Sequence, residues 1–259
     1  MVYAVCSLVY SAFKLALGRD VAWGFEAAGA SDEPLRLRLR PHGSGDRNAE
    51  YDKERGTISF GYYRADPKVM GRNLPGGFVF TCLSHDVVVH EVTHALLDGL
   101  RAHFAHPSGL DVLAFHEAFA DLMAIFQHFS YDRVVEAAIG RSRGNLRDAG
   151  LLTDLATQFG HTVGARGALR SAIDTRSLRH GHDAGGPEAL PPQYGDATEP
   201  HARGSVLTAA VFEAFLTVYE RRIQRFLRLA TGGTGVLPQG ELSADLRAVL
   251  AGEASKLAS

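Results

Sequence analysis

The chain has little of what several large protein classes require. Its two cysteines, Cys6 and Cys82, are too few for a disulfide framework and lack the CxxC spacing of a thiolate metal site. Lys and Arg total 27 against 29 Asp and Glu, so there is no basic excess, and we expect no nucleic-acid partner. Internal repeats and low-complexity tracts are also missing. These absences favour a globular protein in a reducing compartment.

A membrane-spanning run is missing as well. The apolar segment over residues 1–18 contains Lys14 and is shorter than the roughly 20 residues that a spanning helix needs. It also lacks the basic start of a signal peptide. We therefore expect a packed helix or strand here, with a signal peptide as the alternative. The sequence predicts a cytoplasmic protein with no membrane partner.

The hydrophobic pattern changes period after Cys82, from strand-like to helix-like. Alternating Leu and Arg residues predict a half-buried strand, and runs of β-branched and aromatic residues predict others. The predicted strands cover residues 35–40, 57–63 and 78–82, with a loop at 41–48. The predicted helices cover residues 84–100, 111–129 and 204–230 and the C-terminal stretch from residue 241.

Residues 90–94 read HEVTH within the first of these helices. Residues four apart lie one turn above each other, so His90 and His94 project from one face and can bind one metal ion. Neutral imidazole is a good zinc ligand. Glu91 lies about 100° further round the helix, where its carboxylate can take a proton from a water bound to that ion. The alternative is an incidental surface pattern.

A catalytic zinc site has three protein ligands and one open position. The second predicted helix offers Glu117 and Asp121, again four residues apart on one face. One can bind the ion while the other accepts a hydrogen bond from a zinc histidine and fixes its tautomer. Their neighbours are mostly apolar, so these carboxylates need a partner, which a metal cluster supplies. A solvated acidic edge is the alternative.

The pair HEVTH and EAFAD resembles the HExxH and ExxxD motifs of thermolysin-like zinc peptidases, the gluzincins. The resemblance implies an α+β, zincin-like fold, with a β-rich N-terminal lobe, an α-helical C-terminal lobe and the active-site cleft between them. It implies that one Zn²⁺ ion is bound by His90, His94 and Glu117. Glu91 is then the general base, and Asp121 holds a zinc histidine.

Weaker resemblances lie on both sides of these motifs. NAEYDKERGTISFGY is similar to the family's edge strand, where an Asn-Ala pair, here Asn48 and Ala49, binds the substrate backbone by strand addition. ALRSAID resembles the segment with a substrate-binding arginine, here Arg170. DATEPHARGSVLTAA resembles the stretch with the catalytic histidine, which implies that His201 stabilises an oxyanion and that Asp196 orients it.

The chain also departs from the family. The tyrosine that usually precedes the glutamate ligand is missing from HPSGLDV, and Tyr194 is a candidate replacement. Glu50 stands where an aromatic residue often follows the Asn-Ala pair. Acidic calcium loops and a pro-segment are not found, which favours an intracellular enzyme. Residues 1–34 resemble nothing in the family.

The sequence therefore predicts a zinc metallopeptidase that acts on peptides or proteins, with one lobe over residues 1–135 and a second over 136–259. One alternative is a zinc-binding scaffold that has lost turnover, which the missing tyrosine favours. Retention of Glu91 argues against it, because a structural site has no use for a base that is not a ligand. The other is a zinc hydrolase of a non-peptide substrate. The edge strand at Asn48 argues against that, since strand addition suits a peptide backbone.

The chain has 12 histidines, and most lie outside the HEVTH motif. We expect ordinary packing or surface roles for those on or between the two metal-bearing helices, namely His85, His103, His106, His116 and His128. His116 is next to Glu117 and should therefore face another way. His180 and His182 are a candidate second ion site, although a polar loop is favoured there.

Overall fold

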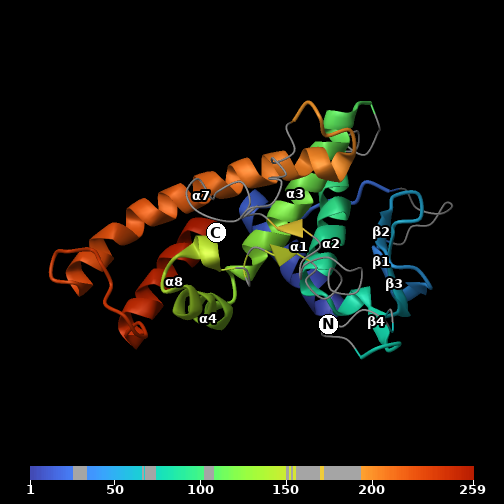
Figure 1. Cartoon of the computed structure of the whole chain (residues 1–259). Coiled ribbons are helices and arrows are strands. Elements are labelled where there is room, and N and C mark those ends of the chain that lie inside the picture. Colours follow the sequence, from blue (N-terminus) through green and yellow to red (C-terminus); the bar gives the residue numbers. More distant parts are fainter. Residues whose placement is uncertain are drawn as a thin grey trace.

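The structure is a computed structural model that describes residues 1–25, 34–65, 67, 74–101, 108–149, 152, 154–155, 170–171 and 194–259. These residues combine small sheets with long helices, so the chain is α+β, as the sequence predicted (Figure 1). The strands are β1 (Arg38–Ser44), β2 (Ala49–Asp52), β3 (Thr57–Arg64), β4 (Phe78–Phe80), β5 (Asp154–Leu155) and β6 (Arg170–Ser171). The helices are α1 (Val2–Leu17), α2 (His85–Leu100), α3 (Leu110–His128), α4 (Asp132–Ser142), α7 (Pro200–Ala230) and α8 (Ala244–Ala258), with 3₁₀ turns η1 (Thr81–Leu83) and η2 (Leu146–Asp148).

The main sheet has the strand order β1-β3-β2, and β4 pairs with the far end of β3. β1 runs parallel to β3, whereas β2 runs antiparallel to it, with Ala49 opposite Phe60. Ile58 and Phe60 of β3 are fully buried and belong to the main hydrophobic core. β2 is therefore an edge strand next to a well-packed central strand.

The predicted strand over residues 57–63 is confirmed by β3, but β1 begins and ends later than predicted. β1 continues through part of the predicted loop, and it includes Pro41. Proline is tolerated there because β1 is an edge strand, where a missing N–H need not break the ladder. A register shift between Arg40 and Ser44 accompanies it. The third predicted strand ends early, at Phe80, where η1 begins.

The helix predictions are confirmed with small shifts at the ends. The N-terminal apolar segment forms α1, which buries one face, including Val5, Val9 and Phe13, in the core. α2 begins one residue after Ser84, but the Ser84 hydroxyl donates to Asp86 and does not cap the backbone. None of the helices in the described ranges has the length and apolar character that crossing a bilayer requires.

α7 begins at Pro200, four residues before its predicted start. The reason is the N-cap residue Glu199, whose carboxylate accepts hydrogen bonds from the backbone N–H groups of His201 and Ala202. Proline at the first helical position suits this geometry, because its missing N–H has no partner to lose. The cap places His201 in the first turn of the helix.

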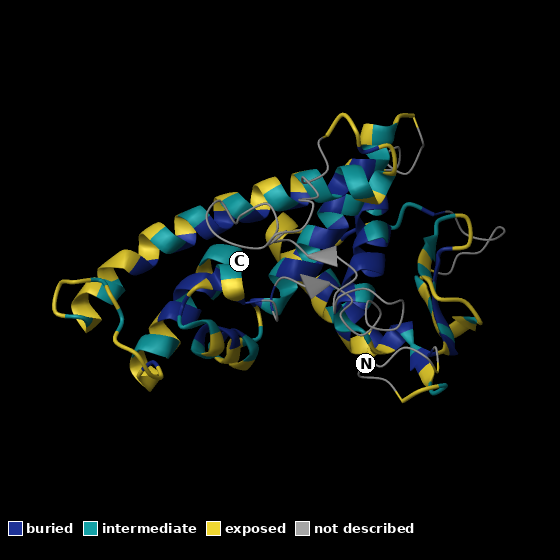
Figure 2. Cartoon of the chain, in the orientation of Figure 1, coloured by how far each residue is buried: buried dark blue, intermediate teal, exposed yellow. Residues whose placement is uncertain are grey.

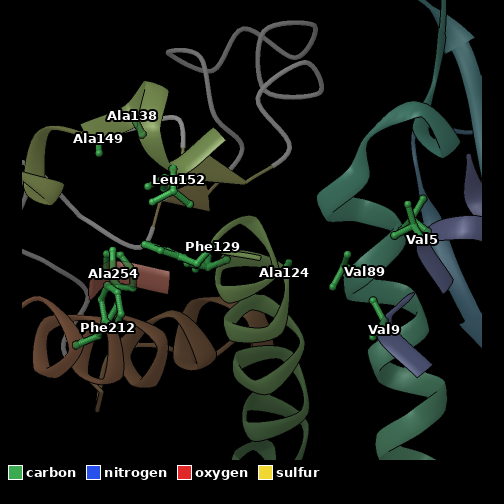
Figure 3. Close-up of a cluster of buried hydrophobic side chains, with 14 of the residues drawn as sticks. Val5, Val9, Val89, Ala124, Phe129, Ala138, Ala149, Leu152, Phe212 and Ala254 are labelled. Atoms are coloured by element: carbon green, nitrogen blue, oxygen red, sulfur yellow. The ribbon is translucent and has the colours of Figure 1, made fainter. Parts of the chain in front are cut away.

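One large cluster of buried apolar side chains joins the helices (Figures 2 and 3). Figure 3 labels Val5, Val9, Val89, Ala124, Phe129, Ala138, Ala149, Leu152, Phe212 and Ala254. The expected boundary between residues 135 and 136 falls inside α4, and Val135 and Ala138 on its two sides both belong to this cluster. Within the described residues, the two expected lobes share a core.

The helix pair α2 and α3 lies at the centre of the molecule (Figure 1). The sheet lies on the α2 side of this pair, α1 packs against α2, and α7 packs across α3 and extends toward α8. Side chains at the α2–α3 contact therefore lie between the edge strand β2 and the N-terminus of α7. The metal-binding residues predicted from sequence lie at this contact.

Candidate metal centre

Three side chains from two helices converge between α2 and α3. One donor atom each of His90, His94 and Glu117 lies within 4.8 Å of the other two. The Nε2 atoms of the two histidines are 2.9 Å apart, and Glu117 Oε2 lies 3.3 Å from His90 Nε2. Two imidazoles and a carboxylate are a donor set of catalytic metal sites that keep one position open. The group can hold a metal ion.

Asp121 contacts the ring nitrogen of His90 that faces away from the other two donors. The Nδ1 atom of His90 lies 2.9 Å from Asp121 Oδ1, and both side chains are buried. Burial opposes a charge on His90, but the contacts with Asp121 and Glu117 outweigh it and raise the pKa of His90 to about 9. A carboxylate at this distance fixes the orientation of the imidazole ring. The structure thus brings Asp121 to one histidine of the group.

His94 is held from behind by another histidine. Its Nδ1 atom lies 2.6 Å from His116 Nδ1, and the two rings stack with their centroids 4.7 Å apart. Burial, followed by the nearby charge of His90, lowers the pKa of His94 well below its ordinary value. Burial also lowers the pKa of His116. Both features favour neutral imidazole rings.

The structure corrects the expectation for His116. The side chains of His116 and Glu117 diverge on α3, as adjacent helical residues must. Both nevertheless reach α2, because the two helices lie side by side and share a wide contact. Whether His116 faces α2 depends on how α3 is rotated about its axis. The position of His116 next to Glu117 in the sequence does not reveal that rotation.

Glu91 is buried on α2, with only 7% of its surface exposed. It is near enough to His90 that, after burial and the contacts with Asp121 and Glu117, its charge also affects the pKa of that histidine. Glu91 is thus a buried carboxylate next to His90 and outside the converging set itself.

The first turn of α7 brings His201 to the group. His201 Nε2 lies 3.0 Å from Glu117 Oε2, and the imidazole is about half exposed. Burial favours the neutral form of Glu117, but contacts with His201 and His90 hold its pKa well below the ordinary value. Glu117 is therefore charged near pH 7, and the half-exposed imidazole of His201 lies next to it.

The carboxylate that the structure places on His201 is that of Glu199, at 2.6 Å from Nδ1. Asp196, the orienting residue expected from the resemblance, is exposed in the turn that precedes α7. Glu199 takes this position because it caps α7, and two backbone N–H groups hold its carboxylate beside the ring. Asp196 and Glu199 both lie shortly before His201 in the sequence, so the sequence does not show which of them contacts the ring. The cap geometry does.

Gly204 allows α7 to pack tightly on α3 at the site. A Cβ atom at this position would lie 2.7 Å from the carbonyl oxygen of Ala114 and 3.2 Å from Glu117 Cβ. The first distance is shorter than any side chain tolerates, so a larger residue would push the helices apart. Sequence reasoning missed Gly204, because a helical glycine becomes informative only when the facing helix is known.

Asp98 connects the edge strand β2 to α2, the helix that carries both histidines of the candidate metal centre. It lies four residues after His94 on α2 and is fully buried. Its carboxylate accepts hydrogen bonds from the Tyr51 hydroxyl at 3.0 Å and from Lys53 Nζ at 2.6 Å. A buried carboxylate needs such partners, and here they come from β2 and the residue after it. The helix α2 thus carries the two histidines of the candidate metal centre and also anchors β2 through Asp98.

The residues expected to bind a substrate backbone lie at the beginning of this strand. Asn48 is exposed, and its carbonyl oxygen accepts the N–H of Gly61 at 2.8 Å. Ala49 opens β2. Arg170 lies in β6, but its side chain is outside the part of the chain that the structure describes. Ala49 is therefore the first residue of an edge strand and Asn48 immediately precedes it, while the Arg170 side chain is not described.

Tyr194, the candidate replacement for the family's tyrosine, is exposed and packs beneath Arg203, with 4.7 Å between the guanidinium and the ring centroid. A hydrogen bond with Asp111, together with partial burial, raises the pKa of Tyr194. The structure therefore assigns its hydroxyl a partner at the first turn of α3.

The other histidines give no second metal group within the described residues. His85 Nε2 is hydrogen-bonded to the Tyr131 hydroxyl at 2.9 Å, and its ring packs near that of His128. Burial, followed by the effect of His128, lowers the pKa of His85. The remaining expectations fall outside the described residues; they concern His103, His106, His180 and His182.

No protein-family model, curated protein or solved structure matches this chain. Its class therefore follows from the fold and the site alone. They define an α+β protein with a candidate metal centre made of two histidines and one glutamate on adjacent helices.

Proposed function

We propose that this protein is a zinc metallopeptidase of the thermolysin-like, zincin-fold type, which hydrolyses peptide bonds. The observation that carries the proposal is the convergence of His90, His94 and Glu117 next to the buried carboxylate of Glu91. Two imidazoles and one carboxylate are sufficient to hold a metal once His90 gives up its proton. The additional acid beside them supports a catalytic metal site over a structural one, because a structural site does not need a base that is not a ligand.

Zinc fits the donor set. Imidazole suits zinc, whereas magnesium and calcium prefer sites made only of oxygen atoms. The outward ring nitrogens of both histidines have acceptor partners, Asp121 and His116, which is the support that zinc histidines need. When bound, zinc supplies Lewis acidity that polarises a carbonyl group and makes a water molecule nucleophilic near neutral pH.

The protein's own residues then perform the proton transfers. Glu91 accepts the proton of the attacking water and delivers it to the leaving amine. His201 in its protonated form donates a hydrogen bond from Nε2 to the oxyanion of the tetrahedral intermediate. Glu199, at 2.6 Å from Nδ1, keeps the ring in the orientation that this bond requires. Asp196 remains a further candidate for that orienting role.

The substrate is a peptide or protein that adds as a strand to the open edge of β2. Main-chain groups at Asn48 and Ala49 pair with its backbone, and Asp98 holds β2 at a fixed distance from the metal helix through Tyr51 and Lys53. Arg170 is the proposed second contact, because a guanidinium group donates well to a peptide carbonyl or carboxylate. Strand addition favours peptides over other hydrolysable substrates.

A second candidate function is a zinc-binding scaffold without efficient turnover. It is favoured by the missing tyrosine, because Tyr194 interacts with Asp111 and leaves His201 as the only oxyanion donor proposed for the described residues. Loss of one such donor costs roughly 10²- to 10³-fold in rate. The scaffold therefore predicts metal binding with little or no cleavage.

The two candidates are separated by measuring bound zinc and cleavage of a mixed peptide library on the same samples. Wild type, Glu91→Gln and the control Glu241→Gln, which makes the same change at an exposed site, are compared. We expect about one zinc ion in all three, and cleavage by wild type and the control only. Zinc binding without cleavage by wild type supports the scaffold or a non-peptide substrate. Absence of zinc contradicts the metal centre itself.

A further inference from the structure

His94 and His116 face each other through the same kind of ring nitrogen. The two Nδ1 atoms are 2.6 Å apart, which is hydrogen-bonding distance, and both rings are largely buried. A neutral imidazole carries one hydrogen, on one of its two nitrogens. In a bond between two such rings, one Nδ1 must donate and the other must accept. The tautomers of His94 and His116 are therefore linked.

The metal group decides which ring donates. His94 turns Nε2 toward His90 Nε2, 2.9 Å away, and toward the carboxylate of Glu117 at 3.7 Å. A nitrogen that binds a metal uses its lone pair, so His94 must carry its hydrogen on Nδ1. His116 must then accept at Nδ1 and carry its own hydrogen on Nε2. The opposite arrangement places a hydrogen on His94 Nε2 and blocks metal binding.

We propose that His116 is a positioning residue that holds His94 in its metal-binding tautomer by accepting a hydrogen bond at Nδ1. This inference rests on the proposed zinc site, and it assigns that site a residue whose role neither the HEVTH motif nor the EAFAD motif includes. His116 precedes Glu117 on α3, so one helix supplies both a ligand and the partner of another ligand.

The geometry fixes His116 as well as His94. The two rings are stacked at an interplanar angle of 26°, and His116 is 7% exposed, so packing restricts the orientation of both rings. The other histidine of the group has a different kind of partner, the carboxylate of Asp121. An anionic partner adds negative charge to the site and increases ligand basicity, whereas a neutral imidazole supplies orientation without that charge.

Two variants of similar size separate hydrogen bonding from packing. His116→Asn keeps an acceptor oxygen near the position of Nδ1, and His116→Leu fills the space with no acceptor. Zinc affinity is measured by competition with a chelator, and the thermal midpoint of each metal-free variant is compared with that of wild type. We expect His116→Leu to bind zinc about 10- to 100-fold more weakly and His116→Asn to stay within about threefold of wild type.

A measurement on the wild-type protein tests the inference without any variant. In protein with ¹⁵N-labelled histidine and bound zinc, nitrogen–hydrogen correlation spectra should show His94 protonated at Nδ1 and His116 protonated at Nε2 only. A hydrogen on His116 Nδ1, or wild-type zinc affinity in a folded His116→Leu protein, overturns the inference and leaves the zinc site standing. If wild type binds no zinc, the proposed function fails first, and this inference fails with it.

Discussion

Two buried regions of this chain are built from opposite kinds of side chain. Between α4, α7 and α8 the interior is apolar and aromatic, and the ring of Phe215 contacts those of Phe129 and Phe212. Between α2 and α3 the interior holds histidines and acids, among them His90 and Asp121. The first region needs only to exclude water, whereas every polar group in the second needs a partner. The difference indicates that the first region maintains the fold, and we propose that the second carries the function.

The largest effect is expected from removing a metal ligand. His94→Ala leaves two converging donors, so zinc binding should weaken far beyond the roughly 10- to 100-fold loss typical of residues behind the ligands. The fold should persist, because the apolar region is unchanged. Zinc content after dialysis and far-UV circular dichroism measure the two effects. A His94→Ala protein that retains wild-type zinc would show that the ion binds elsewhere.

Phe212→Ala is expected to cause a large loss of stability with no change in zinc affinity. Phe212 is fully buried in the apolar cluster, and truncating such a residue typically lowers the free energy of unfolding by about 3–5 kcal/mol. Urea unfolding of the metal-free protein measures this loss. Zinc affinity of the protein that remains folded should match that of wild type. A large change in that affinity would show that the two regions are not separate in function.

A smaller effect on zinc is expected from Asp121→Asn. The amide keeps the shape of the carboxylate but removes the charge that holds His90 Nδ1, so zinc affinity should fall by about 10- to 100-fold. Asp132→Asn, which makes the same change at an exposed position on α4, serves as the control. Chelator competition measures both. Equal zinc affinity in the two variants would show that Asp121 does not support zinc binding.

The smallest effect, taken per pH unit, is a pH dependence confined to the polar region. The raised pKa of His90, about 9, means that the metal-free protein keeps a proton there at neutral pH, and zinc must displace it. Zinc affinity should therefore rise by about tenfold per pH unit as the pH increases toward about 9 and then level off. Calorimetry in buffers of different ionisation enthalpy should detect about one released proton near pH 7. Zinc binding without proton release would contradict the charged state of His90.

The sequence predicts the elements of this chain better than their contacts. The change of hydrophobic period located β3, α2 and α3 closely, because buried faces leave a regular pattern in the sequence. The same reasoning placed His90 and His94 on one face of a helix, and the structure brings Glu117 to them. These features are local, or they depend on a single pair of neighbouring helices.

What the sequence does not predict depends on how distant segments pack. His116 meets His94 only because of the rotation of α3 against α2, and Gly204 matters only because α7 approaches Glu117. Glu199 holds His201 because the helix begins earlier than its hydrophobic pattern suggests. Each of these requires a distance between elements, which periodicity does not contain.

The most direct test of the metal centre is X-ray absorption at the zinc edge on protein loaded with one equivalent of zinc. The account predicts two imidazole nitrogens at about 2.0–2.1 Å and oxygen ligands at about 2.0–2.2 Å, in a site of four or five ligands. The imidazole signal should fall to one ring in the zinc sites that remain in His90→Ala. A sulfur ligand near 2.3 Å, or a shell of oxygen atoms without imidazole, would contradict a centre formed by His90, His94 and Glu117.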